Sequence, residues 1–142
     1  MNNNTADLLN ANHIKLLFSI FKKNEADIRL VGGCIRDSLI NREVKDFDTA
    51  TTVKPSEVLH LLETNNIEYD DYAIQYGSIV SYPLNKKVQI TTLREDINQL
   101  GRHTNVIYTK DWKKDSARRD FTINAMYLSK NNKLYDYYNG KS

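Results

Sequence analysis

The sequence predicts a single α+β domain in which helices pack against a mixed β-sheet. Its 142 residues are enough for one domain with a hydrophobic core of its own. Helical and strand-like segments follow one another from end to end, and no internal repeat, low-complexity run or linker divides them.

The composition indicates in which cellular compartment this domain is expected. The single cysteine, Cys34, cannot form an internal disulfide, and no Cys/His group has the spacing of a zinc site. The start of the chain is polar, and its apolar runs are far shorter than the roughly 20 residues that span a bilayer. We therefore expect a cytoplasmic protein with no export signal or membrane anchor. The net charge of +2 is too small to indicate nucleic-acid binding by itself.

The first third of the chain is predicted to fold as helix, strand, helix. Thr5 or Asp7 can cap a helix that runs to Lys23, because apolar residues recur there at spacings of three and four. Residues 28–31 form a short apolar strand that enters a Gly-Gly turn, and residues 34–40 form a short helix that starts at that turn.

The middle of the chain supplies further strands. Residues 47–52 are strand-like, and the proline at the start of residues 55–64 suits the first turn of a helix. Residues 67–74 are expected to be extended. Residues 78–82 and 87–93 alternate in polarity, which predicts two paired strands.

The last third is predicted to hold a loop, a helix and a closing hairpin. Residues 94–104 are polar and contain a glycine, which is typical of a loop. Asp111 can cap a helix that runs to residue 117. Residues 122–128 and 133–137 are expected to pair as the hairpin.

Tyrosines gather in and beside the extended segment, at Tyr69, Tyr72 and Tyr76. Aromatic side chains of this kind can stack on the bases of a single-stranded nucleic acid. Their spacing and apolar neighbours favour packing in the core or on the sheet instead.

Two aspartates mark the start of the strand at residues 47–52. Side chains at positions i and i+2 of a strand point the same way, so Asp46 and Asp48 present both carboxylates on one face. Two carboxylates this close repel one another unless a cation lies between them. Mg²⁺ prefers oxygen ligands and is commonly held by one or two carboxylates with substrate phosphates. The pair is therefore a candidate magnesium site, although a solvent-exposed Asp-x-Asp turn has the same sequence.

The Gly-Gly turn offers an anion site close to this pair in the sequence. Glycines such as Gly33 let backbone N–H groups approach a phosphate, and a helix N-terminus adds partial positive charge. Arg36 follows within one helical turn, where its guanidinium can reach the same anion. A phosphate site beside a magnesium site is what transfer of a nucleotidyl group requires.

Three segments resemble the tRNA nucleotidyltransferase and bacterial poly(A) polymerase family, the class II branch of the polymerase-beta-like nucleotidyltransferases. They are Leu30-Val31-Gly32-Gly33-Cys34-Ile35-Arg36-Asp37, Lys45-Asp46-Phe47-Asp48-Thr49-Ala50-Thr51 and Arg118-Arg119-Asp120-Phe121-Thr122-Ile123-Asn124-Ala125-Met126. The resemblance implies the polymerase-beta-like nucleotidyltransferase fold, with a mixed, mostly antiparallel sheet and helices packed against it. It also divides the chain into an N-terminal helix packed on the head, at residues 1–26, and a nucleotidyltransferase head domain at residues 27–142.

The resemblance also implies a role for each residue of the first two segments. Asp46 and Asp48 would be the catalytic carboxylates and would bind Mg²⁺. Gly33 and Arg36 would contact the phosphates of the nucleotide.

The third segment would complete the nucleotide site. Arg119 would contact the nucleotide, and Asp120 and Asn124 would serve its sugar. The implied activity is template-independent transfer from CTP and ATP to the 3′ end of tRNA. Members of the family continue into helical neck, body and tail regions that we expect this chain to lack, so a second chain is one way to supply them.

Two alternatives to CCA addition stay open. The head motifs are equally typical of a poly(A) polymerase, which adds only A. Many members carry Glu as a third acidic group where this chain has Gln89, so a non-catalytic nucleotide-binding remnant is the other alternative.

Overall fold

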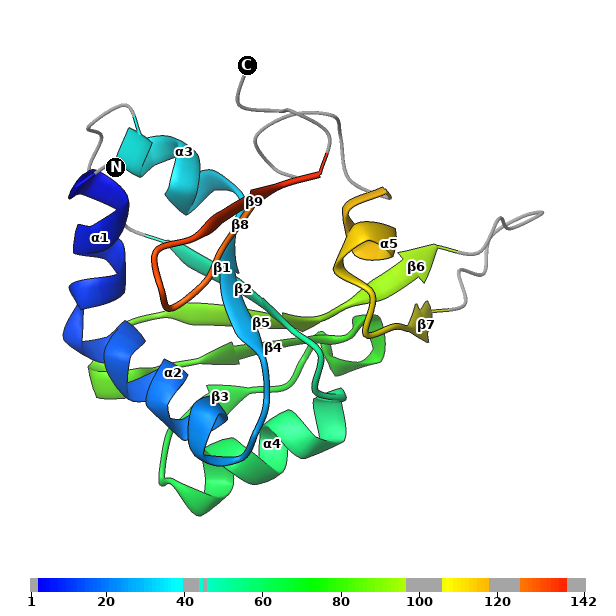
Figure 1. Ribbon diagram of the computed structural model, residues 1–142. Coiled ribbons are helices and arrows are strands. Elements are labelled where there is room, and N and C mark those ends of the chain that lie inside the picture. Colours follow the sequence, from blue (N-terminus) through cyan, green and yellow to red (C-terminus); the bar gives the residue numbers. More distant parts are fainter. Residues whose placement is uncertain (1–2, 40–43, 45, 97–105, 118–125, 138–142) are drawn as a thin grey trace.

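The computed structural model describes residues 3–39, 44, 46–96, 106–117 and 126–137. Its strands are β1 (Ile28–Val31), β2 (Phe47–Thr51), β3 (Tyr69–Asp70), β4 (Ser78–Ser81), β5 (Val88–Thr92), β6 (Arg94–Asp96), β7 (Val106–Tyr108), β8 (Met126–Leu128) and β9 (Leu134–Asp136). Seven of them form one sheet in the order β3-β4-β5-β2-β1-β8-β9, and β6 and β7 form a separate ribbon (Figure 1). In the large sheet β2 and β5 are parallel, and the other neighbouring strands are antiparallel. The prediction of a mixed, mostly antiparallel sheet is confirmed.

The helices are α1 (Asn3–Asn10), α2 (Asn12–Lys23), α3 (Gly33–Leu39), α4 (Pro55–Thr64) and α5 (Trp112–Ala117), with 3₁₀ turns η1 (Ile74–Tyr76) and η2 (Pro83–Asn85). The single N-terminal helix predicted to run to Lys23 is wrong, because Ala11 has an extended backbone, with ψ of 132°, between α1 and α2. The Ala11 carbonyl accepts hydrogen bonds from the N–H groups of Ile14 and Lys15, so it starts α2.

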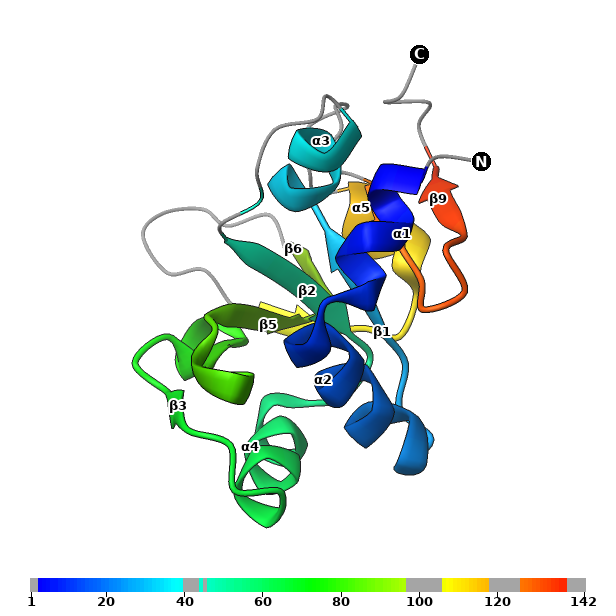
Figure 2. The same cartoon turned by 90° about the vertical axis from the view of Figure 1, so that its left-hand side faces the viewer.

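Helices α1, α2, α3 and α4 pack on one face of the large sheet (Figures 1 and 2). Alternate strand residues point to this face and join the helices in the main core; the largest fully buried members include Ile14, Leu17, Phe21, Leu30, Ile35, Leu62, Ile79 and Ile90. The division of the chain at residue 27 into a helix and a head domain stays a prediction.

Helix α5 packs against the opposite face. There Trp112 forms a second, smaller core with Val31, Ala50, Leu93 and Tyr127. The rings of Trp112 and Tyr127 meet edge to face, with centroids 5.0 Å apart. Asp48, two residues before Ala50 in β2, belongs to this face because strand side chains alternate.

Two expectations for the middle of the chain are wrong. Within the segment predicted to be extended, only Tyr69 and Asp70 form a strand. Tyr72 and Tyr76 are 73% and 56% exposed, so they do not pack in the core, whereas Tyr69 does contact it. The polar segment predicted as a loop begins with β6, which pairs with β7; residues 97–105 lie outside the described residues.

Among the described residues, no helix has both the length and the apolar character needed to cross a lipid bilayer.

Burial of Cys34 predicts a pH-dependent loss of stability. Removal from water raises the pKa of this thiol from 9.0 to about 11. The unfolded chain therefore releases the proton as the pH passes 9, while the folded chain holds it until about 11. We expect the free energy of unfolding to fall by about 2–3 kcal/mol across this window. Urea titrations at several pH values, compared with Cys34→Ala, would test this; a variant with the same slope as the wild type would contradict it.

Candidate functional site

The Gly-Gly turn lies between β1 and α3, and its two glycines differ in backbone conformation. Gly32 has φ of 79°, in the left-handed region that favours glycine. Its carbonyl accepts hydrogen bonds from the N–H groups of Ile35 at 3.0 Å and Arg36 at 3.3 Å, which begins α3. Gly33 does not have positive φ. The turn therefore requires glycine at residue 32 for its conformation.

Gly33 and Arg36 lie together at the start of α3. A Cβ atom added to Gly33 would lie 3.5 Å from Nη2 of Arg36. The Arg36 side chain is half exposed, and its Nε lies 3.3 Å from Oδ1 of Asp37. The guanidinium is thus held by one carboxylate and still faces solvent beside the glycine, where an incoming anion can reach it.

Strand β2 brings Asp48 next to this turn. β1 and β2 pair antiparallel, with Leu30 opposite Thr49, so the end of β1 lies beside Asp48. The Sγ of Cys34, in the first turn of α3, lies 3.9 Å from the backbone oxygen of Asp48. The glycine turn and Asp48, separated by a helix in the sequence, are therefore neighbours in space.

The Asp48 side chain belongs to the face that α5 covers. It lies two residues before Ala50, a member of the smaller core on that face, and strand side chains alternate. Asp48 is half-buried, and Asp46 is exposed just before the strand begins. Gln89 of β5 lies directly opposite Asp48 in the parallel pair. The position at which the resemblance implies a third acidic group is thus beside Asp48.

A buried carboxylate fixes α5 to this face. Asp115 is fully buried and accepts a hydrogen bond of 2.6 Å from the Tyr127 hydroxyl and one of 3.0 Å from the backbone N–H of Arg94. These bonds join α5 to β8 and to β6. Sequence reasoning missed Asp115, although a carboxylate three residues after an apolar tryptophan in a short amphipathic helix was a possible signal.

Only some of the predicted site residues lie in the described part of the chain. These are Gly33, Arg36, Asp46 and Asp48, of which Asp48 lies beside the turn that holds Gly33. Arg119, Asp120 and Asn124 lie outside the described residues. The segment that holds them follows α5 and precedes β8, the two elements that the Asp115–Tyr127 hydrogen bond joins.

The donor set fits a magnesium ion better than a transition metal. No group of three or more His, Cys, Asp and Glu side chains suited to a metal occurs in the part of the chain that the structure describes. Asp46 and Asp48 offer oxygen ligands, and Mg²⁺ accepts one or two carboxylates when phosphates and water complete its shell. A zinc site would need more nitrogen or sulfur ligands.

The two glycines make a matched test of the turn. Gly32→Ala is expected to lower the free energy of unfolding by about 1–2 kcal/mol, because alanine strains at positive φ. Gly33→Ala should leave stability nearly unchanged, since its new methyl group makes only an ordinary contact with Arg36. It should weaken triphosphate binding, because the methyl group obstructs approach to the backbone N–H groups. Urea unfolding and titration with CTP would separate the two effects; equal stability losses would refute this account.

Comparison with known proteins identifies the family model and the relatives that this chain matches. The family model described as the poly A polymerase head domain matches residues 28–142. A CCA tRNA nucleotidyltransferase 1, mitochondrial, of Danio rerio is 38% identical over 125 residues, which cover 87% of this chain and 29% of that protein. A CCA-adding enzyme of Staphylococcus haemolyticus is 30% identical, covering 91% of this chain and 32% of the enzyme.

Solved structures agree with this assignment. The Bacillus stearothermophilus CCA-adding enzyme in complex with CTP superposes with a TM-score of 0.78 at 25% identity, covering 92% of this chain and 31% of the enzyme. A tRNA nucleotidyltransferase complexed with a primer tRNA and an incoming ATP analog gives a TM-score of 0.64 at 26% identity, covering 88% of this chain and 35% of that one. The chain spans about three tenths of the length of the curated relatives it matches.

Proposed function

Because this chain belongs to the poly(A) polymerase head-domain family of CCA tRNA nucleotidyltransferases, we propose that it carries the nucleotidyl-transfer site of CCA addition. In that reaction the 3′-hydroxyl of tRNA attacks the α-phosphate of CTP or ATP, a phosphodiester bond forms, and pyrophosphate leaves. The observation that supports it most is the 3.9 Å contact that brings the first turn of α3 beside Asp48. A phosphate site and an acidic site then share one end of β1.

The residues near this end of β1 would have different roles in the reaction. The backbone N–H groups at Gly33 and the guanidinium of Arg36 would bind the triphosphate and balance charge on the leaving pyrophosphate. Asp46 and Asp48 would hold Mg²⁺, which when bound acidifies the attacking hydroxyl and neutralises charge at the reacting phosphate. Arg119 would contact the nucleotide, and the roles of Asp120 and Asn124 at its sugar stay predictions.

Substrates and location are part of the proposal. The relatives are named as mitochondrial and bacterial enzymes, and two solved relatives are complexed with CTP or with tRNA and an ATP analog. For this chain we propose CTP, ATP and the 3′ end of tRNA as substrates, with a cytoplasmic location. The chain matches about three tenths of these relatives, so we propose that it acts together with regions equivalent to the remainder of those enzymes, a second chain being one possible source.

Incorporation of radiolabelled CMP and AMP into tRNA that lacks its 3′ CCA tests this proposal. The chain would be assayed alone and as a chimera in which it replaces the matched region of the Bacillus stearothermophilus enzyme. We expect Mg²⁺-dependent incorporation of both nucleotides by the chimera. AMP without CMP would indicate a poly(A) polymerase instead. No incorporation by a folded chimera that still binds tRNA would refute the proposal.

Gln89 favours a second candidate, a nucleotide-binding protein without catalysis. This neutral side chain lies opposite Asp48, so the described acidic site has one negative charge fewer than three carboxylates would give. This candidate predicts CTP binding with no turnover, and Asp48→Ala would then change no measurable activity.

Gln89→Glu is expected to strengthen metal binding by about tenfold, because it adds a carboxylate beside Asp48. Isothermal titration with Mg²⁺ in the presence of CTP would measure this. Gln75→Glu, in the exposed turn η1, makes the same change in charge away from the site and is the control. Equal gains in the two variants would mean that overall charge, and not position 89, is responsible.

A further inference from the structure

A basic groove lies between α2 and the turn that joins β8 to β9. It consists of two adjoining hollows of about 240 Å³ and 250 Å³, and Phe18, Lys22 and Lys130 line both. Ile28, the first residue of β1, also lines the groove, whereas the Gly-Gly turn follows the last residue of that strand. The groove is therefore separate from the candidate nucleotide site, by roughly 13 Å of strand.

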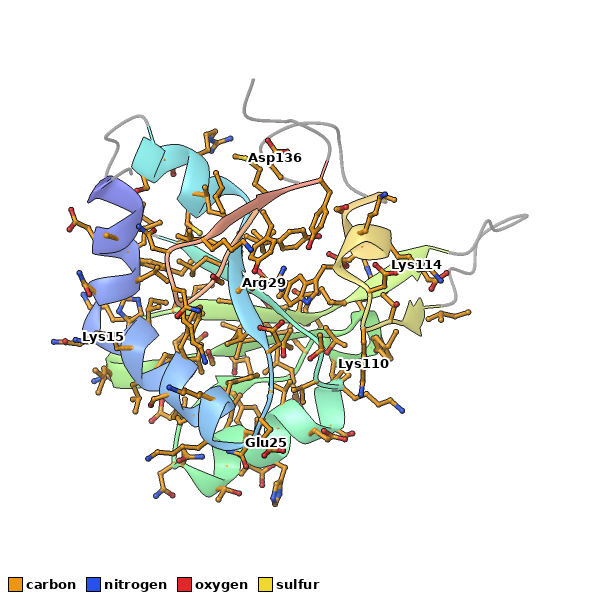
Figure 3. All side chains as sticks on the ribbon, in the orientation of Figure 1. Lys15, Glu25, Arg29, Lys110, Lys114 and Asp136 are labelled. Carbon is orange, nitrogen blue, oxygen red and sulfur yellow. The ribbon has the colours of Figure 1, made fainter. Side chains whose placement is uncertain are left out.

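One wall of the groove is a single face of α2. Lys15, Phe18, Ser19 and Lys22 are spaced at i, i+3, i+4 and i+7, which places them on one side of a helix. Phe18 is buried in the main core and anchors this face, while both lysines are exposed. Their Cα atoms are about 10 Å apart along the helix axis. Figure 3 shows Lys15 on the helical side of the molecule and Arg29 on β1 in its middle.

The other wall is a tight turn with fixed geometry. The N–H of Ser129 donates to the carbonyl of Lys133 at 3.0 Å, and the N–H of Asn132 donates to the carbonyl of Ser129 at 2.9 Å. Asn132 has φ of 60°, which asparagine tolerates well. These bonds set Lys130 and Asn131 at the tip of the turn, where both are exposed and line the groove.

Cations and hydrogen-bond donors line the groove beside apolar side chains. Lys15, Lys22 and Lys130 carry ammonium groups, and the Ser129 hydroxyl is buried with no hydrogen-bond partner among the described residues. The lining carboxylate, Asp27, is already occupied, because its Oδ2 lies 3.4 Å from Nη2 of Arg29. Such a lining suits a ligand that carries negative charge and only accepts hydrogen bonds, which describes a phosphate diester.

Arg29 itself belongs to the scaffold of this groove. Its guanidinium carbon lies 3.9 Å from the ring centroids of both Trp112 and Tyr135. This sandwich, together with the Asp27 contact, holds the side chain at 11% exposure. Arg29 therefore joins the floor of the groove to α5 on the catalytic face, and the three lysines are the groups available to an external ligand.

We propose that this groove binds the sugar-phosphate backbone of RNA, without regard to base sequence. The cations are spread along two hollows, which matches an extended polyanion better than a single nucleotide. The aliphatic and phenyl side chains of the lining, among them Leu9, Phe18 and Ile28, offer no hydrogen-bonding group that distinguishes one base from another. The choice of RNA as the polyanion rests on the proposed function.

Fluorescence anisotropy of labelled tRNA lacking its 3′ CCA, with the full chain and over a range of salt concentrations, tests the groove. The double variant Lys22→Glu/Lys130→Glu is expected to bind at least about tenfold more weakly near 0.1 M salt. The slope of log affinity against log salt should fall in size by roughly 0.7 to 0.9 for each lost phosphate contact. Its control, Lys23→Glu/Lys54→Glu, alters two exposed lysines outside the groove by the same charge and should keep nearly the wild-type slope.

Two results would overturn the proposal. One is equal loss of tRNA affinity in the groove variant and its control, with both folded by circular dichroism. The other concerns poly-glutamate. If poly-glutamate binds as tightly as tRNA, and if this binding also depends on Lys22 and Lys130, the groove would be assigned to an acidic polypeptide. CTP titration of the groove variant should match the wild type. Because tRNA binding requires no turnover, a chimera that binds tRNA but does not incorporate CMP would refute the catalytic proposal alone.

Discussion

Asp48→Asn is expected to lower nucleotide incorporation by about 10³-fold while the chain stays folded and still binds nucleotide. The backbone of Asp48 lies beside the first turn of α3, and Asp48 is opposite Gln89 in the pair of β2 and β5, so it is the aspartate that described contacts place next to the phosphate site. A metal ligand supports several kcal/mol of transition-state stabilisation, and each 1.36 kcal/mol is worth about tenfold in rate. Asparagine keeps the shape and one oxygen but removes the charge.

The measurement is kcat/KM for CMP incorporation by the chimera, with CTP affinity measured in parallel. Asp71→Asn is the matched control, because this aspartate is exposed just after β3, and two strands, β4 and β5, lie between β3 and β2. A variant at residue 48 that retained more than a tenth of wild-type activity would show that Asp48 does not hold the catalytic metal. Raising the Mg²⁺ concentration should recover part of the lost rate if the effect is on metal affinity.

Asp115→Ala is expected to lower the free energy of unfolding by about 2–4 kcal/mol. It would leave two groups without their acceptor, the buried Tyr127 hydroxyl and the backbone N–H of Arg94. An unsatisfied buried donor costs about 1–3 kcal/mol. The same change should weaken nucleotide binding, since the Asp115–Tyr127 bond joins the elements on either side of the segment that holds Arg119.

Asp111→Ala is the control on the same helix. The exposed Asp111 caps α5, and its Oδ1 accepts from the N–H groups of Lys113 at 2.9 Å and Lys114 at 3.2 Å. Loss of such a cap costs about 1 kcal/mol. Urea unfolding of both variants gives the comparison. A smaller loss at residue 115 than at residue 111 would mean that the buried carboxylate contributes little, and Tyr127→Phe in a double-mutant cycle would measure the coupling directly.

The described helices and most of the described strands were predictable because their signals are local. Apolar spacing marked α2 and α4, and alternation marked β4 and β5, since each pattern depends on residues within a turn or two. The break at Ala11 was missed because apolar residues continue through it. The ribbon of β6 and β7 was missed because β6 is polar and the two short strands pair with each other and not with the large sheet.

Local chemistry also made the glycine turn predictable. The φ of 79° at Gly32 depends on the backbone of that residue alone, so the turn follows from the sequence. The common face of Asp46 and Asp48 stays a prediction, because Asp46 lies before β2 begins.

The tertiary structure alone determined which residues, distant in the sequence, are neighbours in space. Asp48 lies opposite Gln89 because β2 and β5 pair in parallel across 41 positions of sequence, and Lys22 and Lys130 line one groove because the turn between β8 and β9 lies beside α2. Burial of Asp115 and exposure of Tyr72 were likewise set by packing. Contacts between distant segments depend on the free energy gained when the whole chain buries its apolar surfaces together. The spacing of neighbouring residues does not determine this free energy.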